Sequence, residues 1–102
     1  MKLGLRCSKE VNNYTGSIRY YKDDKLHRAD GPAVELARGY KGWMLNGEFH
    51  REDGPARTWI TRYNKRYNYY LNNVRYSNKD KYDAELQRRK LNVIDKSDAS
   101  RD

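Results

Sequence analysis

The sequence predicts a mainly β protein, a meander of short antiparallel β-hairpin repeats with a C-terminal α-helix cap. Two observations lead to this prediction. The phrase "HRADGPA" at residues 27–33 recurs as "HREDGPA" at residues 50–56, so the chain repeats one unit after twenty-three positions. Dipeptides that favour two-residue hairpin turns recur near the same period, whereas a helix-like pattern begins only at residue 77.

The repeat extends beyond the shared phrase. Residues 20–36 align with residues 43–59, and a degraded third copy occupies residues 69–76 without the DGPA letters. We therefore expect residues 1–76 to form one β-hairpin repeat domain of two and a half units.

Each unit is expected to begin with a tight hairpin. Asn46-Gly47 is the strongest signal, because both central residues of a type I′ turn need a positive φ. Asp23-Asp24 and Asn72-Asn73 are weaker versions of the same turn.

The shared phrase is expected to form a second turn that is scaffold rather than an active site. Its aspartate can accept a backbone N–H, its glycine can take a left-handed conformation, and its proline begins the next strand. Short strands follow at residues 33–37 and 56–62, and alternation places Arg57, Trp59 and Thr61 on one face. The residues assigned to these turns are His27, Arg28, Asp30, Gly31 and Pro32 in the first unit and His50, Arg51, Asp53, Gly54 and Pro55 in the second.

The two histidines of the phrase could bind a metal together with its aspartates, or one could act as a general base. Their spacing follows the repeat period, which favours a structural position in each unit, bonded to backbone or stacked on an aromatic ring. In the same way, we expect each arginine of the phrase to brace its turn by pairing with the aspartate two residues later. No metal and no cofactor are expected.

The C-terminal part is expected to be a capping helix over residues 77–93, helical from about residue 79 to 91, followed by a flexible tail at residues 94–102. Ser77 or Asn78 can cap its N-terminus, and acidic residues precede basic ones along it, which suits the helix dipole. The apolar stripe expected to close the end of the sheet consists of Tyr82, Leu86 and Val93.

Composition limits the classes of function. The chain has 102 residues, enough for one domain, and Cys7 is its single cysteine, which excludes an internal disulfide and a multi-cysteine zinc site. No nucleophile motif or phosphate-binding glycine loop is present, and no apolar run reaches the length of a signal peptide or a membrane span. We expect a non-enzymatic, cytoplasmic protein that does not bind membranes; the role of Cys7 is open.

The charge is concentrated in one segment. Of the formal net charge of +8, six positive charges and no acid fall within residues 57–79, interleaved with aromatic residues. Such a surface can neutralise the phosphates of a nucleic acid and stack on its bases. Alternatively, the aromatic residues are half-buried strand residues and the cations form a solvated rim around them. On a strand, Tyr67 and Tyr69 share one face and Tyr70 takes the other. The predicted binding patch comprises Arg57, Trp59, Arg62, Lys65, Arg66, Tyr67, Tyr69 and Arg75.

The pattern of an aromatic residue, two positions, "NG" and then "HRxDGPA" resembles the MORN-like repeats of small bacteriophage accessory proteins. The resemblance covers residues 20–76 and implies a binding scaffold rather than an activity. It suggests a phage protein, in the bacterial host cytoplasm, that inhibits or redirects a host defence or transcription protein by docking onto its acidic surface. Binding of nucleic acid by the same patch is the alternative, a small anion is a third possibility, and open sheet edges make a homo-oligomer possible.

Overall fold

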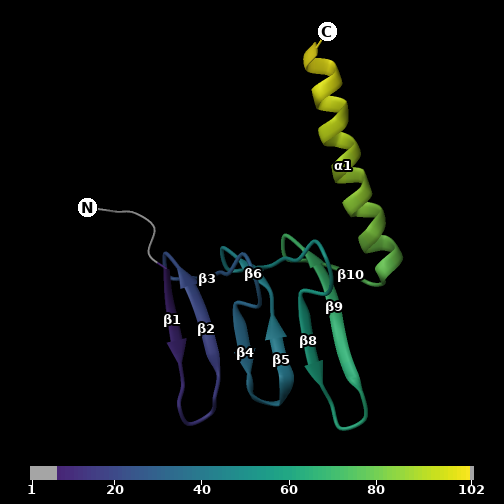
Figure 1. Cartoon of the computed structure of the whole chain (residues 1–102). Helices are drawn as coiled ribbons and strands as arrows, with labels where there is room; N and C mark the ends of the chain where they lie inside the picture. Colours follow the sequence, from purple (N-terminus) through teal and green to yellow (C-terminus); the bar gives the residue numbers. More distant parts are fainter. Residues whose placement is uncertain (1–6, 102) are drawn as a thin grey trace, which may run out of the picture.

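The computed structural model describes the backbone of residues 7–101 and the side chains of residues 7–91. The predicted fold class is confirmed: the chain forms a thin antiparallel meander followed by one helix (Figure 1). The shortest dimension of the molecule is 17 Å, so the sheet is a single layer with no second sheet packed on it. The sheet order is β1 (Cys7–Val11), β2 (Ile18–Lys22), β4 (Val34–Leu36), β5 (Tyr40–Gly42), β8 (Arg57–Ile60), β9 (Lys65–Leu71) and β10 (Val74–Tyr76).

Three tight hairpins line one end of this sheet (Figure 1). They join β2 to β3 (Lys25–Leu26), β6 (Met44–Leu45) to β7 (Glu48–Phe49), and β9 to β10. Both central residues of each turn have a positive φ, as a type I′ turn requires, so all three predicted hairpin turns are confirmed. The φ values are 51° and 69° at Asp23-Asp24, 51° and 83° at Asn46-Gly47, and 50° and 69° at Asn72-Asn73.

Successive hairpins are fastened to one another by backbone hydrogen bonds. The N–H of Gly47 in the second turn donates to the carbonyl of Leu26 at 2.8 Å, and the N–H of Asn73 in the third turn donates to the carbonyl of Phe49 at 2.8 Å. A unit therefore leaves a carbonyl that only the next unit satisfies, which is how a short repeat gains stability from stacking.

The core is small, as the polar composition requires. Ala33, Val34 and Met44 form a buried cluster beneath partly buried Leu26, Leu36, Tyr40 and Phe49. Ala33 and Ala56 are the last residues of HRADGPA and HREDGPA, and both are completely inaccessible to solvent. Their backbones bond to the flanking strands on both sides, Ala33 to Gly42 and Tyr20 and Ala56 to Asn68 and Trp43. Each repeated motif thus ends at a fully buried residue of the sheet.

Helix α1 (Lys79–Arg101) begins as expected but does not end as expected. Asn78 caps it, because its Oδ1 accepts the N–H of Lys81 at 2.9 Å. The predicted end near residue 91 and the flexible tail at 94–102 are wrong as far as Arg101: the segment contains neither glycine nor proline, so no residue stops the helix.

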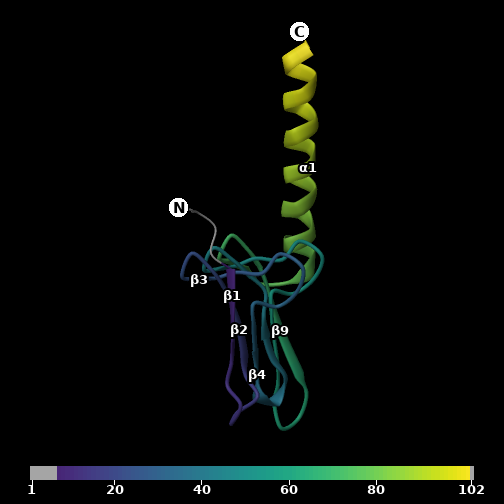
Figure 2. The same ribbon diagram turned by 60° about the vertical axis from the view of Figure 1, so that its left-hand side comes forward.

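The helix contacts the sheet only through its first turns and then projects away from it (Figures 1 and 2). Of the expected apolar stripe, Tyr82 is buried and Leu86 is partly buried, whereas the side chain of Val93 lies outside the described residues. No helix within residues 7–101 is both long and apolar enough to cross a membrane.

Candidate binding surface

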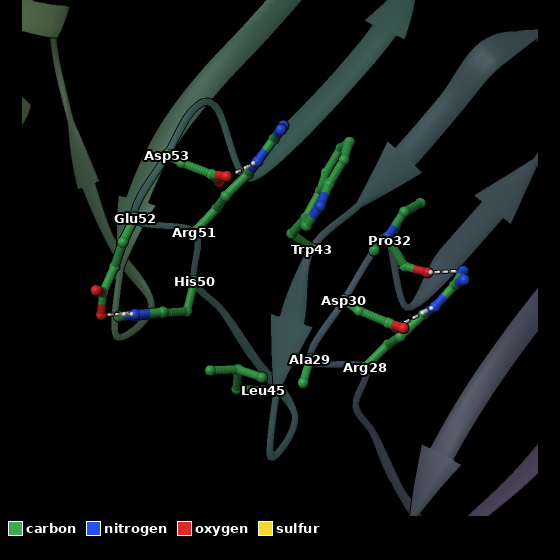
Figure 3. A pocket seen from close by; sticks show the side chains of 11 residues that line it. Arg28, Ala29, Asp30, Pro32, Trp43, Leu45, His50, Arg51, Glu52 and Asp53 are labelled. Carbon is green, nitrogen blue, oxygen red and sulfur yellow. Dashed lines mark hydrogen bonds and ion pairs between the residues drawn. The ribbon is translucent and has the colours of Figure 1, made fainter.

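The two repeated phrases are built around an arginine that is fully committed within the protein (Figure 3). Arg28 Nε donates to Asp30 Oδ1 at 3.1 Å and Arg28 Nη1 donates to the carbonyl of Pro32 at 3.3 Å. The corresponding distances from Arg51 to Asp53 and Pro55 are 2.9 and 3.1 Å. Each guanidinium also lies over an aromatic ring, Arg28 at 4.1 Å from the centroid of Tyr20 and Arg51 at 3.9 Å from that of Trp43.

This arrangement changes the reason for the glycine and aspartate of the phrase. Gly31 has a negative φ, so the predicted left-handed conformation is wrong there. Gly54 has a positive φ of 158°, which residues other than glycine rarely adopt. Glycine is needed for space: a Cβ would approach the guanidinium carbon of the arginine to 2.9 Å at Gly31 and 3.0 Å at Gly54. The aspartate accepts from the arginine side chain rather than from a backbone N–H.

The histidines connect neighbouring units. His27 Nδ1 accepts the N–H of Asn46 at 2.9 Å, and His50 Nδ1 accepts the N–H of Asn72 at 2.9 Å. Each ring therefore satisfies a donor in the turn of the following hairpin, in agreement with a structural position bonded to backbone. Within the described residues, no group of three or more histidine, cysteine, aspartate and glutamate side chains could hold a metal ion.

The third unit has no arginine at this position, and the helix supplies a replacement that the sequence did not reveal. The ring of Tyr82 packs on Tyr69 with centroids 4.7 Å apart, and its hydroxyl donates to the carbonyl of Arg51. The same hydroxyl accepts the N–H of Gly54 at 3.3 Å. Burial raises the pKa of Tyr82, so the hydroxyl keeps its proton and remains a donor.

A salt-bridge cluster holds the second turn of the helix to the third hairpin. Glu85 accepts from Arg88 at 2.6 Å and from Arg89 at 2.9 Å, and Arg89 also donates to Asn72 Oδ1 at 2.8 Å. Hydrogen bonds from Arg88 and Arg89 lower the pKa of Glu85 to about 2.

The eight residues of the predicted binding patch do not share one face. In antiparallel pairs, opposite residues point to the same side, and Trp59 is opposite Arg66 whereas Tyr67 is opposite Thr58. One face therefore carries Arg57, Trp59, Arg66 and, through the register of β10, Arg75; the other carries Lys65, Tyr67 and Tyr69; Arg62 lies in the connecting turn.

Two members of the patch are structural. Arg57 Nε donates to the Tyr40 hydroxyl at 3.3 Å, and its guanidinium lies 4.5 Å from the centroid of Trp59. Tyr69 is covered by Tyr82. Tyr69 therefore agrees with the interpretation in which the aromatic residues of this stretch are half-buried. Arg57 does not belong to a solvated rim of cations, because Tyr40 and Trp59 hold it.

Four further members, Arg62, Lys65, Arg66 and Tyr67, lie at the end of the β8–β9 hairpin, which we call the hairpin tip and define as residues 60–67. Trp59 and Arg75 lie outside it, on β8 and β10. All eight of these residues are exposed, and the large apolar side chains Ile60, Tyr63 and Tyr67 keep 55%, 84% and 54% of their surface. In the part of the chain that the structure describes, no ion pair engages Arg62, Lys65 or Arg66. Ile60 and Tyr63 belong to this exposed group although the predicted patch did not include them.

The hairpin tip is ordered by its own hydrogen bonds. Thr61 N donates to the carbonyl of Asn64 at 2.8 Å, and Thr61 Oγ1 accepts the N–H groups of Tyr63 and Asn64 at 3.3 and 3.1 Å. In Figure 1 the tip lies at the end of the sheet opposite the helix and the three small hairpins. The arrangement presents cations and aromatic rings on a preformed turn.

Comparison of the chain with protein-family models, with curated proteins and with solved structures finds no match to any of them.

Proposed function

We propose that the protein is a non-catalytic binding module whose hairpin tip docks onto an acidic surface of a partner protein. The observation that supports this proposal is the combination, on one ordered turn, of three cations that form no ion pair with a described residue and three exposed large apolar side chains. Arginine and tyrosine dominate the energetics of protein interfaces, and cations opposite an acidic surface steer association.

The order of the turn favours binding. A flexible loop would lose conformational freedom on docking, whereas the bonds between Thr61 and Asn64 hold Arg62 and Tyr63 in place beforehand. Less of the interaction energy between the two proteins is then lost to ordering the loop, so the affinity is higher.

The biological setting rests on the resemblance to MORN-like repeats of bacteriophage accessory proteins. In that setting the module acts in the bacterial host cytoplasm and inhibits or redirects a host protein of defence or transcription. The sheet serves as the scaffold that holds the tip, and no reaction is assigned to it.

A nuclease-treated pull-down from bacterial lysate tests this proposal. The protein is compared with a hairpin-tip variant that combines Arg62→Ser, Lys65→Ser and Arg66→Ser. We expect a protein partner that survives nuclease treatment and co-elutes in size exclusion with the original protein but not with the variant. Capture of the same partner by both proteins, or loss of all capture after nuclease treatment, would count against the proposal.

Nucleic-acid binding by the same tip is the second candidate, favoured by the absence of any acid in residues 57–79. Phosphates would meet Arg62, Lys65 and Arg66, and a base would stack on Tyr63 or Tyr67. Titration of single- and double-stranded DNA and RNA at two salt concentrations tests it, because release of counterions makes such binding fall steeply with salt. Absence of binding at low salt removes this candidate.

Self-association through the open edge of the sheet stays a prediction. The N–H of Asn12 donates to the carbonyl of Ser17, the residue before β2, so by alternation the N–H of Lys9 faces the free edge of β1. A second copy paired symmetrically about this strand would place Lys9 opposite Lys9, which is unfavourable. We therefore propose that edge pairing is weak, and measurement of molar mass by light scattering over a concentration series tests it.

A further inference from the structure

Two clefts on the sheet are related by the repeat. One lies between β1 and the first phrase, has a volume of about 610 Å³ and is lined by Tyr20, Lys22, His27, Arg28, Ala29 and Asp30. The other lies between the two phrases, has a volume of about 570 Å³ and is lined by the residues twenty-three positions later, Trp43, Leu45, His50, Arg51, Glu52 and Asp53 (Figure 3). The same scaffold is therefore present twice with different side chains.

The difference between the phrases HRADGPA and HREDGPA is one residue, Ala29 in place of Glu52. In the second cleft, Glu52 Oε2 lies 2.8 Å from His50 Nε2, and Figure 3 shows the two side chains in contact. In the first cleft, Ala29 offers no carboxylate, and none of the residues 7–91 accepts a hydrogen bond from His27 Nε2.

The tautomer of His27 follows from its other nitrogen. Because Nδ1 accepts the N–H of Asn46, the neutral imidazole must carry its proton on Nε2. The first cleft therefore contains an N–H donor without an acceptor among the side chains that the structure describes, whereas the equivalent donor in the second cleft is satisfied by Glu52.

The charges of the two clefts are opposite. Three cations line the first cleft, Lys9, Lys22 and Arg28, against the single carboxylate of Asp30. Two arginines line the second cleft against three carboxylates, and Leu45 stands where the first cleft has Lys22. The Lys9 ammonium lies 5.6 Å from the centroid of the Tyr20 ring, so it is held over the cleft rather than away from it.

We propose that the first cleft binds the phosphate group of a small molecule. The ammonium groups of Lys9 and Lys22 supply charge-assisted hydrogen bonds to its oxygens, and the neutral His27 ring supplies another through Nε2. Arg28 is already paired with Asp30 and, at 3.7 Å, with Glu35. The two positive charges of Lys9 and Lys22 match a phosphomonoester dianion better than a carboxylate monoanion. This site is separate from the hairpin tip and does not depend on the function proposed for that tip.

Side-chain ¹H–¹⁵N correlation spectra of the two histidines test the proposal, because each histidine reports on its own cleft. Inorganic phosphate and adenosine 5′-monophosphate are the probes, with acetate at matched ionic strength as the carboxylate control. We expect saturable shifts of His27 Nε2 with both phosphate probes, smaller shifts with acetate and none at His50.

Ala29→Glu is the matched variant, because it gives the first unit the sequence HREDGPA, which already folds in the second unit of the same protein. The new carboxylate takes the His27 donor and repels the anion, so we expect affinity for phosphate to fall at least about tenfold with unchanged thermal stability. Lys22→Leu, the residue of the second unit, should also weaken binding.

Three outcomes overturn the proposal: no shift at His27, an undiminished shift in the Ala29→Glu protein, or equal shifts with acetate. If phosphate moves only resonances of residues 60–67, the anion binds at the hairpin tip and the cleft is not its site.

Discussion

The repeated phrases and the hairpin tip use the same cation in opposite ways. In the repeated motifs, Arg28 and Arg51 each donate hydrogen bonds to the aspartate two residues later and to the carbonyl of the following proline. At the tip, Arg62 and Arg66 have no acid within the surrounding segment 57–79, and no ion pair to a described residue. Local sequence thus decides whether an arginine stabilises the fold or remains available to a partner.

The largest effect on stability should come from removing an arginine of a repeated motif, and an arginine of the hairpin tip is the comparison. Arg51→Ala deletes the stack on Trp43, the pair with Asp53 and the bond to a turn carbonyl, so we expect a loss of about 2 kcal/mol in the free energy of unfolding. Arg66→Ala should change it by less than about 0.5 kcal/mol, because the side chain is exposed and forms no ion pair with a described residue. Urea unfolding measures both, and equal losses in the two variants would contradict the distinction.

A smaller loss should follow from breaking the link between units. His50→Ala leaves the N–H of Asn72 without its acceptor, which should cost about 1–2 kcal/mol in the free energy of unfolding. His50→Asn is the control, because an amide oxygen can take the place of Nδ1 and should restore part of the stability. If both variants unfold like the original protein, the histidine is not the link between units.

Tyr82 tests whether the helix completes the third unit in the way that arginine completes the first two. Tyr82→Phe keeps the ring on Tyr69 but removes the hydroxyl that bonds to Arg51 and Gly54, so we expect a loss of about 1 kcal/mol on chemical unfolding. An unchanged midpoint in Tyr82→Phe would mean that ring packing alone attaches the helix.

Breaking the salt-bridge cluster of Glu85 should have the smallest effect on stability, and that effect should depend on pH. Because the pKa of Glu85 is lowered from 4.5 to about 2 in the folded protein, its contribution to stability is complete above about pH 4.5 and is lost as the pH falls towards about 2. A carboxyl ¹³C titration should place its midpoint well below that of an unpaired glutamate. In Glu85→Gln, the part of the acid destabilisation that falls in this window should disappear; an unaltered profile would rule out the pairing with Arg88 and Arg89.

Sequence reasoning succeeded where structure is local. The three hairpin turns follow from adjacent residues that tolerate positive φ, and the pairing of each arginine with its aspartate follows from a spacing of two. It failed where a packed side chain decides: the guanidinium of Arg51 leaves little room for a Cβ at Gly54, and Tyr82 of the helix packs on Tyr69 of the third unit.

The binding patch was only partly predictable for the same reason. Alternation along β9 separates Tyr67 from Arg66, but the engagement of Arg57 by Tyr40 depends on the pairing of β5 with β8. The end of the helix was missed because no residue after Leu91 signals either a stop or a continuation.

The most direct test of the central claim is the dissociation constant of the captured partner for two variants of equal charge. One removes the tip cations by Arg62→Ser, Lys65→Ser and Arg66→Ser; the other removes three exposed cations elsewhere by Lys25→Ser, Lys81→Ser and Lys90→Ser. If the tip carries the interaction, the first variant should bind at least about tenfold more weakly and the second within about twofold of the original protein. Equal weakening in both variants would show that net charge, rather than the hairpin tip, carries the binding.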